Sequence, residues 1–573
     1  MSSRVERIAD DRRLWTALVV LALLLRVVAW LERSGRATLT AMLDTQLYRA
    51  MADALVDGGF VLDRAFFMSP LYPYVLALVE RPLGPGAVIV GQSVLGVAAL
   101  LVLARAAREL AGPVTGAATL LLGAATPPLI LYDTSLLPDG PAAACTAIAV
   151  AGVILREPWG RRALWMAGMA LGVGIALRSN LLLLWLLLGL GVVWSLRTDR
   201  RLALHSALAL LAPGLVAMVL LSAHNLAAEG LWQPRSYNGG LNLYVGNNPA
   251  AEGTYTNVQE VHPGDPTGQE AAQRARGRTL NSAEVEAFWR ERAVEFLVSD
   301  PGRAVQLALT RAVLFVHPFS MPQMEDAALA ARESRVLAWA PFGFGVVLGL
   351  AVLGAWQPLV RMRRPRWPLV VLVLMAFAVG VVFFVNGRLR LAVWPALLVF
   401  AGSGIHQLVV AYVQRRLRPL FAPLLVVLLL RAGTLLFPVH ETYRHAMSAA
   451  RYASIEATHG NERLAREWLL VMDAIMNEPA RFGDGRAIDA SYAEKPDAEV
   501  MLRLERAVAL YTVGDDRAAL EVLLDVLGQR PGLRRAMQVL AAVTDRMQRA
   551  GSDDPRLPEA RALLREHGGS GRS

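Results

Sequence analysis

The run LWTALVVLALLLRVVAW, from Leu14 to Trp30, contains a single charged residue, Arg26. An apolar stretch of about 17 to 25 residues is long enough to cross the hydrocarbon core of a bilayer as a helix, because a helix satisfies its own backbone hydrogen bonds there. The next residues, Leu31-Glu32-Arg33-Ser34, do not form the small-residue cleavage site of a signal peptide. The run therefore predicts an uncleaved first span.

Similar apolar runs recur along the chain as far as Phe437, and we count about eleven. Their expected starts lie near Leu14, Ala87, Val114, Gly140, Leu164, Leu181, Leu204, Val336, Trp367, Leu391 and Leu420. The predicted fold class is an all-α polytopic membrane protein with an extracytoplasmic loop layer and a C-terminal α-helical, repeat-like tail. A shorter apolar stretch, Ala304 to Val316, is broken by Arg311 and is expected to be interfacial or re-entrant, with a span over 304–318 as the open alternative.

The composition supports a membrane protein. Of 573 residues, 55% are hydrophobic and 18% charged, and the mean hydropathy is +0.39. The net charge is +10, but the basic residues form short clusters between apolar runs, which indicates topology and not a nucleic-acid surface. The only cysteine, Cys145, excludes an intrachain disulfide and leaves thiol or zinc chemistry without a ligand set.

Arginine clusters set the expected orientation, because positively charged loops translocate poorly. When the spans are counted in order, the clusters all fall on one side, at 4–13, 105–108, 156–162, 197–201, 361–366 and 415–418. The N-terminus is therefore expected in the cytoplasm. The loops 32–85 and 225–335 and the tail after Phe437 are expected on the extracytoplasmic side.

The first outer loop contains the first candidate acid. Met42 to Ala52 has the pattern of a short amphipathic helix in which Asp44 lies one turn before Tyr48, and Ser69-Pro70-Leu71-Tyr72-Pro73-Tyr74 follows. A carboxylate there could accept a proton from an acceptor hydroxyl. A solvated helix acid or an N-cap is the alternative for Asp44.

Charged residues also stand at other outer span ends. Asp133 and Asp139 lie between two apolar runs, where an acid is costly unless it is paired, binds a metal or faces water; capping of the next helix is the alternative. Arg178, Arg388 and Arg390 lie on the side where the positive-inside rule does not explain them. Their guanidinium groups suit a phosphate, and non-specific contact with lipid phosphates is the alternative.

The long outer loop is rich in Asn and Gly from Asn238 to Pro249, and it includes Asn242 and Asn247. Such residues make turns and present amide groups that suit hydroxyl-rich ligands, but they are equally common in plain loops.

A different pattern begins after Phe437, where hydropathy falls and a helical period appears, most clearly from Val500 to Leu527. Six residues fall close to the tetratricopeptide pattern, with one residue missing between its tyrosine and glycine positions: Leu504, Tyr511, Gly514, Ala519, Leu520 and Pro531. We therefore expect a transmembrane domain over 1–437 and a soluble, tetratricopeptide-like helical tail over 438–573 that serves a protein partner. An unrelated helical bundle is the alternative, since a self-standing solenoid normally needs three repeats.

Taken in order, these motifs resemble the bacterial members of the GT-C superfamily of glycosyltransferases that use polyprenyl-phosphate sugars, near the protein mannosyltransferase and aminoarabinose transferase relatives. The resemblance covers roughly Leu14 to Gln414. It rests on Asp44 with Tyr48, Ser69 to Tyr74, Tyr132 to Asp139, Ala176 to Asn180, Asn238 to Pro249, and Gly387 to Leu391 leading to Pro395.

The resemblance implies a multi-pass hexosyl- or pentosyltransferase of the bacterial cytoplasmic (inner) membrane that serves the cell envelope. Its donor would be a polyprenyl-phosphate-linked sugar and its acceptor an extracytoplasmic glycolipid, glycan or protein. The sugar would be transferred by one inverting displacement. No cofactor is certain, and a divalent metal ion is left open. No nucleic-acid partner is expected.

The resemblance also implies roles for residues. Asp44 would be the catalytic carboxylate, assisted by Asp133 or Asp139. The donor phosphate would be neutralised by Arg178, Arg388 and Arg390. The remaining candidates for substrate binding are Tyr48, Tyr72, Asn180, Asn242 and Asn247. Asp44 and the two late arginines must then meet at one extracytoplasmic site. In the motif around Arg178, this sequence has Ser179 where the family usually has proline. Between the last two arginines it has Leu389 where the family often has an aromatic residue. These departures leave the donor sugar undetermined.

Three other classes compete with this interpretation. A transporter or flippase would place ionisable residues at the membrane midplane on broken helices of related halves, whereas here they stand at span ends and no internal repeat is visible. An O-antigen ligase or polymerase-like enzyme would use His224 with the outer arginines. An assembly protein would use the spans as an anchor and the tail to recruit partners.

Overall fold

The computed structural model describes residues 2–40, 42–255, 258, 261, 265–323, 325–357, 359–435, 441–478 and 497–568. Over these residues the chain is helical without a strand, and one isolated bridge joins Thr254 to Val385. This confirms the all-α prediction for the described part. The chain divides into two compact units, of which the first comprises Met1–Glu32, Asp44–Gln323 and Ser334–Phe437 and the second Arg33–Leu43, Met324–Glu333 and Pro438–Ser573.

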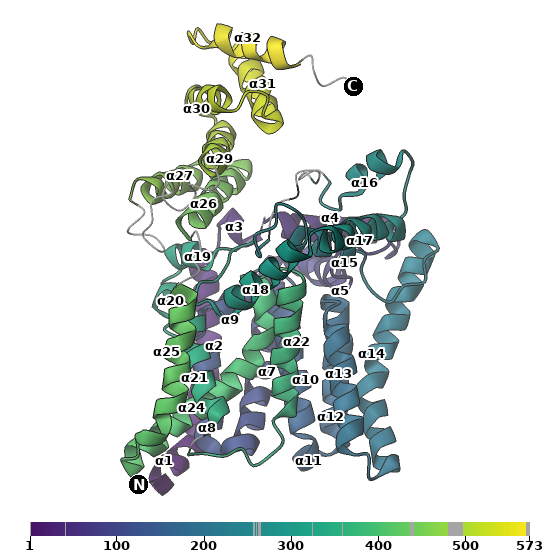
Figure 1. Ribbon diagram of the computed structural model, residues 1–573, viewed down its shortest axis with the longest axis vertical. Coiled ribbons are helices and arrows are strands. Elements are labelled where there is room, and N and C mark those ends of the chain that lie inside the picture. The colour runs from purple at the N-terminus through teal and green to yellow at the C-terminus, as the bar shows by residue number, and fades with distance from the viewer. Residues whose placement is uncertain are drawn as a thin grey trace. The chain divides into compact units, whose positions relative to one another are not determined.

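The first unit holds the long apolar helices and the short helices between them (Figure 1). Its first half contains α1 (Ser2–Ala9), α2 (Arg12–Arg33), α4 (Leu43–Asp57), α5 (Leu71–Val75), η1 (Leu76–Glu80), α6 (Arg81–Leu83), α7 (Pro85–Ala111), α8 (Pro113–Ala124), α9 (Pro127–Asp133), α10 (Asp139–Ile154), α11 (Arg156–Trp159), α12 (Arg161–Leu177), α13 (Leu181–Ser195) and α14 (Arg200–Glu229). Its second half contains α15 (Gly239–Gly246), α16 (Gln269–Arg276), α17 (Ser282–Ser299), α18 (Pro301–Val316), α20 (Arg335–Trp339), α21 (Phe344–Trp356), α22 (Trp367–Val382), α23 (Gly387–Arg390), η2 (Leu391–Val393), α24 (Trp394–Gln414), η3 (Arg418–Leu420) and α25 (Phe421–Leu435).

Five helical segments of the described chain are long and apolar enough to cross a membrane: α2, α7, α14, Gly387–Gln414 and Arg418–Leu435. The pair α8 and α9, bent by 58°, would be a sixth. The expectation of about eleven spans is therefore not confirmed. The other expected spans coincide with α10, α12, α13, α21 and α22, which have 16, 17, 15, 13 and 16 residues. At about 1.5 Å per residue such helices fall short of a hydrocarbon core of about 30 Å. The apolar stretch within α18 is not among the candidate spans.

Small residues bring the apolar helices close together. A Cβ atom on Gly404 of α24 would lie 2.1 Å from the carbonyl oxygen of Leu350 in α21, and one on Gly168 of α12 would lie 2.5 Å from that of Ala209 in α14. Where lipid gives no hydrophobic drive between helices, such close backbone packing is the main source of association. The glycines therefore fix which helices are neighbours.

The two long loops between the spans lie at one end of the first unit. α4 and α5, from the first loop, and α16 and α17, from the second, lie at the end of the helix bundle opposite to the N-terminus and α11 (Figure 1). Which side of a membrane this end faces stays a prediction.

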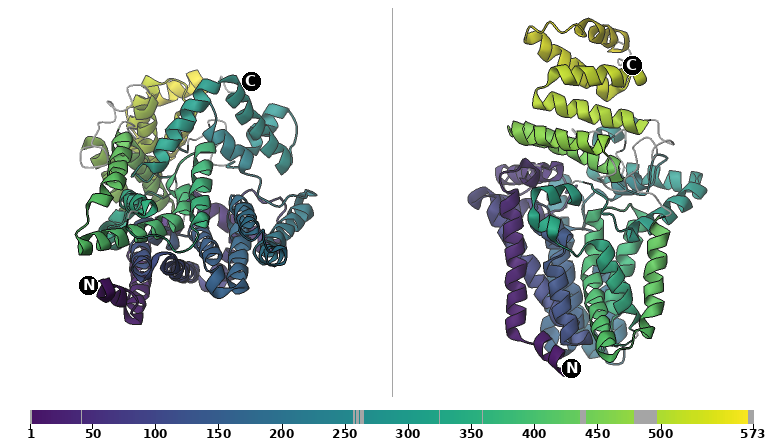
Figure 2. Two further views of the ribbon diagram at one scale, coloured as in Figure 1. Left: turned by 60° about the horizontal axis from the view of Figure 1, so that its bottom comes forward. Right: turned by 90° about the vertical axis from the view of Figure 1, so that its left-hand side faces the viewer.

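The second unit contains α3 (Ala37–Thr40), α19 (Ala327–Glu333), α26 (Glu441–Thr458), α27 (Glu462–Asn477), α29 (Asp497–Val513), α30 (Asp516–Gln529), α31 (Arg534–Arg549) and α32 (Leu557–Gly568). The C-terminal helices stack in chain order (Figure 2). Between α29 and α30, Gly514 has φ +90°, a backbone conformation that favours glycine, and the side chain of Asp515 caps α30. The tetratricopeptide interpretation stays a prediction. A weaker copy of the pattern falls at Gly460, Ala465, Trp468 and Pro479, of which Pro479 lies outside the described residues.

Candidate functional site

Asp44 lies in the first turn of helix α4 and is buried, with Tyr48 one turn later on the same face. The positive end of a helix dipole stabilises a carboxylate in the first turn. Oδ2 of Asp44 accepts a hydrogen bond from Nη1 of Arg388 at 2.5 Å. This contact joins the first outer loop to Arg388, one of the two late arginines that the resemblance implies should meet Asp44.

Asp139 joins the same arginine from another element. It is the first residue of α10, and its Oδ2 accepts from Nη2 and Nε of Arg388 at 3.0 and 3.2 Å. Its Oδ1 accepts from Nη2 of Arg178, the residue that ends α12. Asp44, Asp139, Arg178 and Arg388 therefore form one acid–arginine cluster with two negative and two positive groups.

The turn that carries Arg388 is tightly held. The side chain of Asn386 accepts from the backbone N–H of Leu389 at 2.7 Å and caps α23. The N–H of Gly387 donates to the carbonyl of Met321 at 2.9 Å, and a Cβ on this glycine would lie 2.7 Å from Oγ of Ser320. A larger residue at this position would require the Ser320 hydroxyl to move.

The two cations of the cluster differ in exposure. The side chain of Arg178 is 28% exposed, whereas that of Arg388 is 5% exposed and bonds to both carboxylates. A ligand phosphate can therefore approach Arg178 without first breaking the link between the two acids.

Two tyrosines support the loop beside the cluster. The ring of Tyr48 lies edge to face with that of Tyr72, with centroids 5.2 Å apart. The hydroxyl of Tyr48 donates to Oγ of Ser69 at 3.0 Å, and that of Tyr72 donates to Oε1 of Gln92 at 2.7 Å. Burial raises the pKa of both phenols, Tyr72 most strongly, so both stay neutral and act as donors. Both side chains are 1% exposed, so the positions predicted to bind substrate are occupied by internal contacts.

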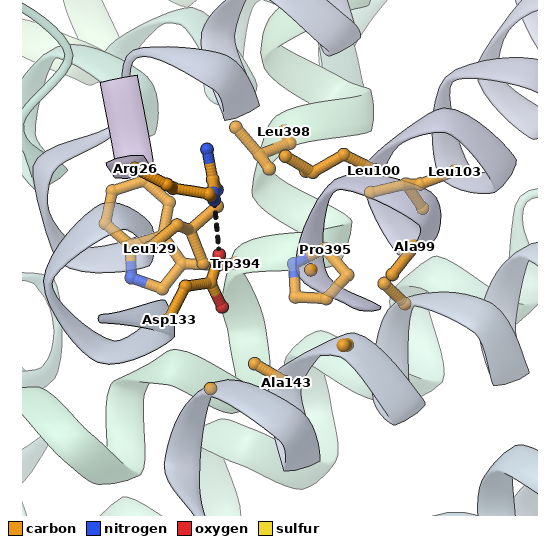
Figure 3. A pocket seen from close by; sticks show the side chains of 14 residues that line it. Arg26, Ala99, Leu100, Leu103, Leu129, Asp133, Ala143, Trp394, Pro395 and Leu398 are labelled. Carbon is orange, nitrogen blue, oxygen red and sulfur yellow. Dashed lines mark hydrogen bonds and ion pairs between the residues drawn. The ribbon is translucent and has the colours of Figure 1, made fainter. Parts of the chain in front are cut away.

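Asp133 has a different partner from Asp139. Its Oδ2 accepts from Nε of Arg26 at 2.7 Å, and the pair lines a mainly apolar pocket with Leu129, Trp394 and neighbouring residues (Figure 3). Among the contacts of the described residues, none joins Asp133 to the cluster. The structure therefore brings together Asp139 and Asp44 and leaves Asp133 as the counter-ion of a buried arginine.

Arg390 also points away from the cluster. It donates from Nη1 to the carbonyl of His317 at 2.6 Å and from Nη2 to that of Phe319 at 2.5 Å. Its guanidinium lies 4.2 Å from the ring centroid of Phe344. Positions i and i+2 of a helix are about 200° apart, so Arg388 and Arg390 face different sides of α23.

The three candidate asparagines have different surroundings. The amide nitrogen of Asn247 donates to the carbonyls of Leu243 and Val382, both at 2.9 Å, and its oxygen accepts from Arg311 at 3.1 Å. These bonds tie α15 to α22 and α18 and use both donors. Asn242 lies on the same helix, α15, and is half-buried. Oδ1 of Asn180 is buried and has no hydrogen-bond partner among the described residues. It stands two residues after Arg178, so it is the asparagine with acceptor capacity nearest in sequence to the cluster.

The sequence did not predict several residues that contact the candidate site residues. Ser69 lies in a motif that the sequence singled out without a role for the serine, whereas Gln92 and Arg26 are polar residues inside apolar runs. A polar side chain in a membrane helix signals a buried partner, which is the clue that could have paired Arg26 with an acid. His224 stacks on Phe66, with centroids 4.0 Å apart, and Nδ1 lies 3.2 Å from the hydroxyl of Tyr74. The described contacts do not join His224 to Arg178, Arg388 or Arg390.

The residues do not fit a divalent metal site. Over the described chain, no three His, Cys, Asp or Glu side chains gather as a ligand set. Asp44 and Asp139 meet through Arg388, whose guanidinium occupies the bridging position that a cation would need. We therefore derive no step through a metal ion.

The fold and the site define the class of protein: it is all-α, with helices suited to a membrane and an acid–arginine cluster at the ends of several helices.

No family model and no curated protein matches the sequence. Two solved structures of an oligosaccharyltransferase from Archaeoglobus fulgidus are similar in part. AglB in complex with an inhibitory peptide and a dolichol-phosphate is 12% identical with a TM-score of 0.36, and the match covers 76% of this chain and 58% of that one. The apo form is 11% identical with a TM-score of 0.35, and the match covers 76% and 57%. The matches thus span less than two thirds of the archaeal chains.

Proposed function

We propose that this chain is a membrane glycosyltransferase of the GT-C type that moves a sugar from a polyprenyl-phosphate donor to an extracytoplasmic acceptor. The observation that carries the proposal is the cluster in which Arg388 joins Asp44 to Asp139, which in turn bonds to Arg178. It supplies a carboxylate base and a cation for a phosphate beside apolar helices. Displacement of a lipid-linked phosphate needs both.

In the proposed reaction, an acceptor hydroxyl attacks the anomeric carbon of the sugar. The new carbon–oxygen bond forms as the bond to the phosphate oxygen breaks, and that electron pair leaves with polyprenyl phosphate. The hydroxyl proton passes to Asp44 as general base. One such displacement inverts the anomeric carbon.

The two arginines take separate roles. Arg178, as the more exposed cation, binds the donor phosphate and stabilises the charge that develops on it. Arg388 orients the carboxylates of Asp44 and Asp139, because its donors are already shared between them. In this assignment Asp139 holds both guanidinium groups in place, and Asp133 and Arg390 take no part in the chemistry.

The proposal includes a location. The protein would lie in a bacterial cytoplasmic membrane with its N-terminus inside and the cluster and C-terminal helices outside. A lipid-linked donor would then reach the cluster from the bilayer, and a glycolipid, glycan or protein acceptor from the extracytoplasmic space.

The test is a mass-spectrometric comparison of surface glycans and lipid-linked sugars in host cells with and without the gene. The deletion strain is complemented with the wild type, Asp44→Asn or Asp53→Asn. Asp53 is the matched control, because it lies on the same helix but its side chain is 57% exposed. We expect one glycan to be lost on deletion and restored by the wild type and Asp53→Asn only. Full restoration by Asp44→Asn would remove Asp44 from the mechanism.

A further inference from the structure

The segment that precedes Asp44 belongs to the second unit. Arg33–Leu43 groups with the C-terminal helices, although it lies between α2 and α4 in the sequence. The peptide bond from Leu43 to Asp44 therefore connects the second unit directly to the candidate catalytic carboxylate.

Glu456 on α26 holds the segment at the start of α3. Its Oε2 accepts from the backbone N–H of Ala37 at 3.1 Å and its Oε1 from that of Thr38 at 3.2 Å. Amides at a helix start have no partner inside the helix, and a carboxylate satisfies them and favours the dipole. Glu456 is 0% exposed, and Nδ2 of Asn461 donates to its Oε2 at 2.6 Å, so the cap is fixed in position.

Two further contacts hold the same segment on either side of this cap. Nε of Arg33 lies 3.0 Å from Oε2 of Glu333, and Oε1 of the same carboxylate accepts from Oγ1 of Thr38 at 2.8 Å. Met42, two residues before Asp44, is 1% exposed and packs in the hydrophobic core of the C-terminal helices. The segment is thus held at its start, at α3 and at its end.

The other segment that groups with the C-terminal helices, Met324–Glu333, is held by the same helix, α26. The backbone N–H of Asp326 donates to the hydroxyl of Tyr452 at 2.8 Å, and Oδ2 of Asp326 lies 2.7 Å from Nδ1 of His445. The two segments that interrupt the first unit therefore converge on α26.

We propose that Glu456 is a positioning residue for Asp44: it caps α3 and so fixes the path of the chain that delivers the carboxylate to the cluster. The proposal rests on the proposed role of Asp44 as the base. It makes the C-terminal helices part of the enzyme's working structure, whereas an accessory tail could be removed without affecting transfer. A misplacement of about 1 Å can cost on the order of 100-fold in rate, so a loosened cap is sufficient to slow transfer.

The test compares four full-length variants with the wild type. Glu456→Ala removes both acceptors, Glu456→Asp keeps a carboxylate, and Asn461→Ala leaves Glu456 in place without its own support. Glu462→Ala is the matched control, since Glu462 is an exposed acid at the start of α27. Hydrogen exchange of the amides from 37 to 48 is measured by mass spectrometry on the purified protein, with its melting temperature. The glycan product is measured in complemented cells.

With Glu456→Ala we expect exchange over 37–48 to be roughly tenfold faster and the product to fall roughly tenfold. Glu456→Asp should recover part of both, and Glu462→Ala should behave as the wild type. Unchanged exchange over 43–48, or an unchanged product despite faster exchange, would overturn the proposal.

If Glu456→Ala does not fold, Asn461→Ala decides by the same two readouts, with smaller changes of the same sign. If the wild type restores no glycan, the proposed function fails, and exchange over 43–48 alone then decides whether Glu456 fixes the start of α4.

Discussion

Nη1 of Arg388 lies 2.5 Å from Oδ2 of Asp44, across a sequence separation of 344 residues. The same guanidinium bonds to Asp139, so one side chain fixes the relative positions of two carboxylates in the first turns of different helices. Removing it would leave two buried acids facing each other.

The first prediction concerns Arg388. Arg388→Lys keeps one charge but loses the planar fork that serves two carboxylates at once, so we expect transfer to fall on the order of 100-fold. The measurement is the glycan product in complemented cells at matched protein levels. Arg81→Lys is the control, because that arginine pairs with Asp53 and its side chain is 46% exposed. Near-normal transfer by Arg388→Lys would show that orienting both acids is not required.

Arg390 should behave differently from its neighbour. Arg390→Leu leaves the buried carbonyl of His317 and the part-buried carbonyl of Phe319 without these donors, at about 1–3 kcal/mol for each group that stays unsatisfied. We expect a lower melting temperature of the detergent-solubilised protein and normal transfer per folded molecule. Loss of transfer at an unchanged melting temperature would instead place Arg390 in the chemistry.

Arg26 and Asp133 form a buried ion pair that a double-mutant cycle can separate from catalysis. Either single change, Arg26→Gln or Asp133→Asn, leaves an unpaired buried charge and should destabilise the fold by about 3–5 kcal/mol. The double variant should recover a large part of that stability. Thermal unfolding checks the stability, and the glycan product checks the role. A folded double variant that transfers no sugar would show that Asp133 is needed for catalysis.

The second unit should lose stability as the pH rises through the pKa of His445. Burial lowers that pKa, but the hydrogen bond and negative charge of Asp326 together raise it more, so the pKa of folded His445 lies above its usual value. A raised folded pKa adds stability that is fully present below the unfolded pKa of about 6.5 and disappears above the folded pKa. The wild type should therefore lose more stability between pH 6 and pH 9 than His445→Gln. Equal losses, measured by proteolysis of the C-terminal helices, would contradict this.

The candidate site could be predicted in part. Asp139, Arg178 and Arg388 stand at the ends of apolar runs, where acids and arginines signal partners. Asp44 lies in the loop after the first run, and only the family resemblance implied that it meets the late arginines. The sequence could not choose between Asp133 and Asp139, because both lie in the short link between two apolar runs. Only the structure shows that Asp133 ends α9 and Asp139 begins α10. Nor could it choose between Arg388 and Arg390. Their side chains point in different directions because the segment Gly387–Arg390 is helical, which the sequence did not show.

The span count shows a different limit. Hydropathy marks an apolar run but not where its helix is interrupted, so runs that look alike in sequence gave helices of 30 residues in α14 and 13 in α21. Proline and glycine breaks and the close packing of neighbouring helices decide those lengths.

By itself, the sequence determined that this protein is helical, that most of its helices seek an apolar environment, and that its last part does not. These properties depend on local composition and period, which neighbouring residues carry. Only the tertiary structure decided that Arg388 joins Asp44 to Asp139, that Asp133 belongs to Arg26, and that Glu456 caps the segment before Asp44. Those pairings join residues separated by about a hundred to over four hundred positions, and such contacts depend on how packed helices aim their side chains, which no local pattern encodes.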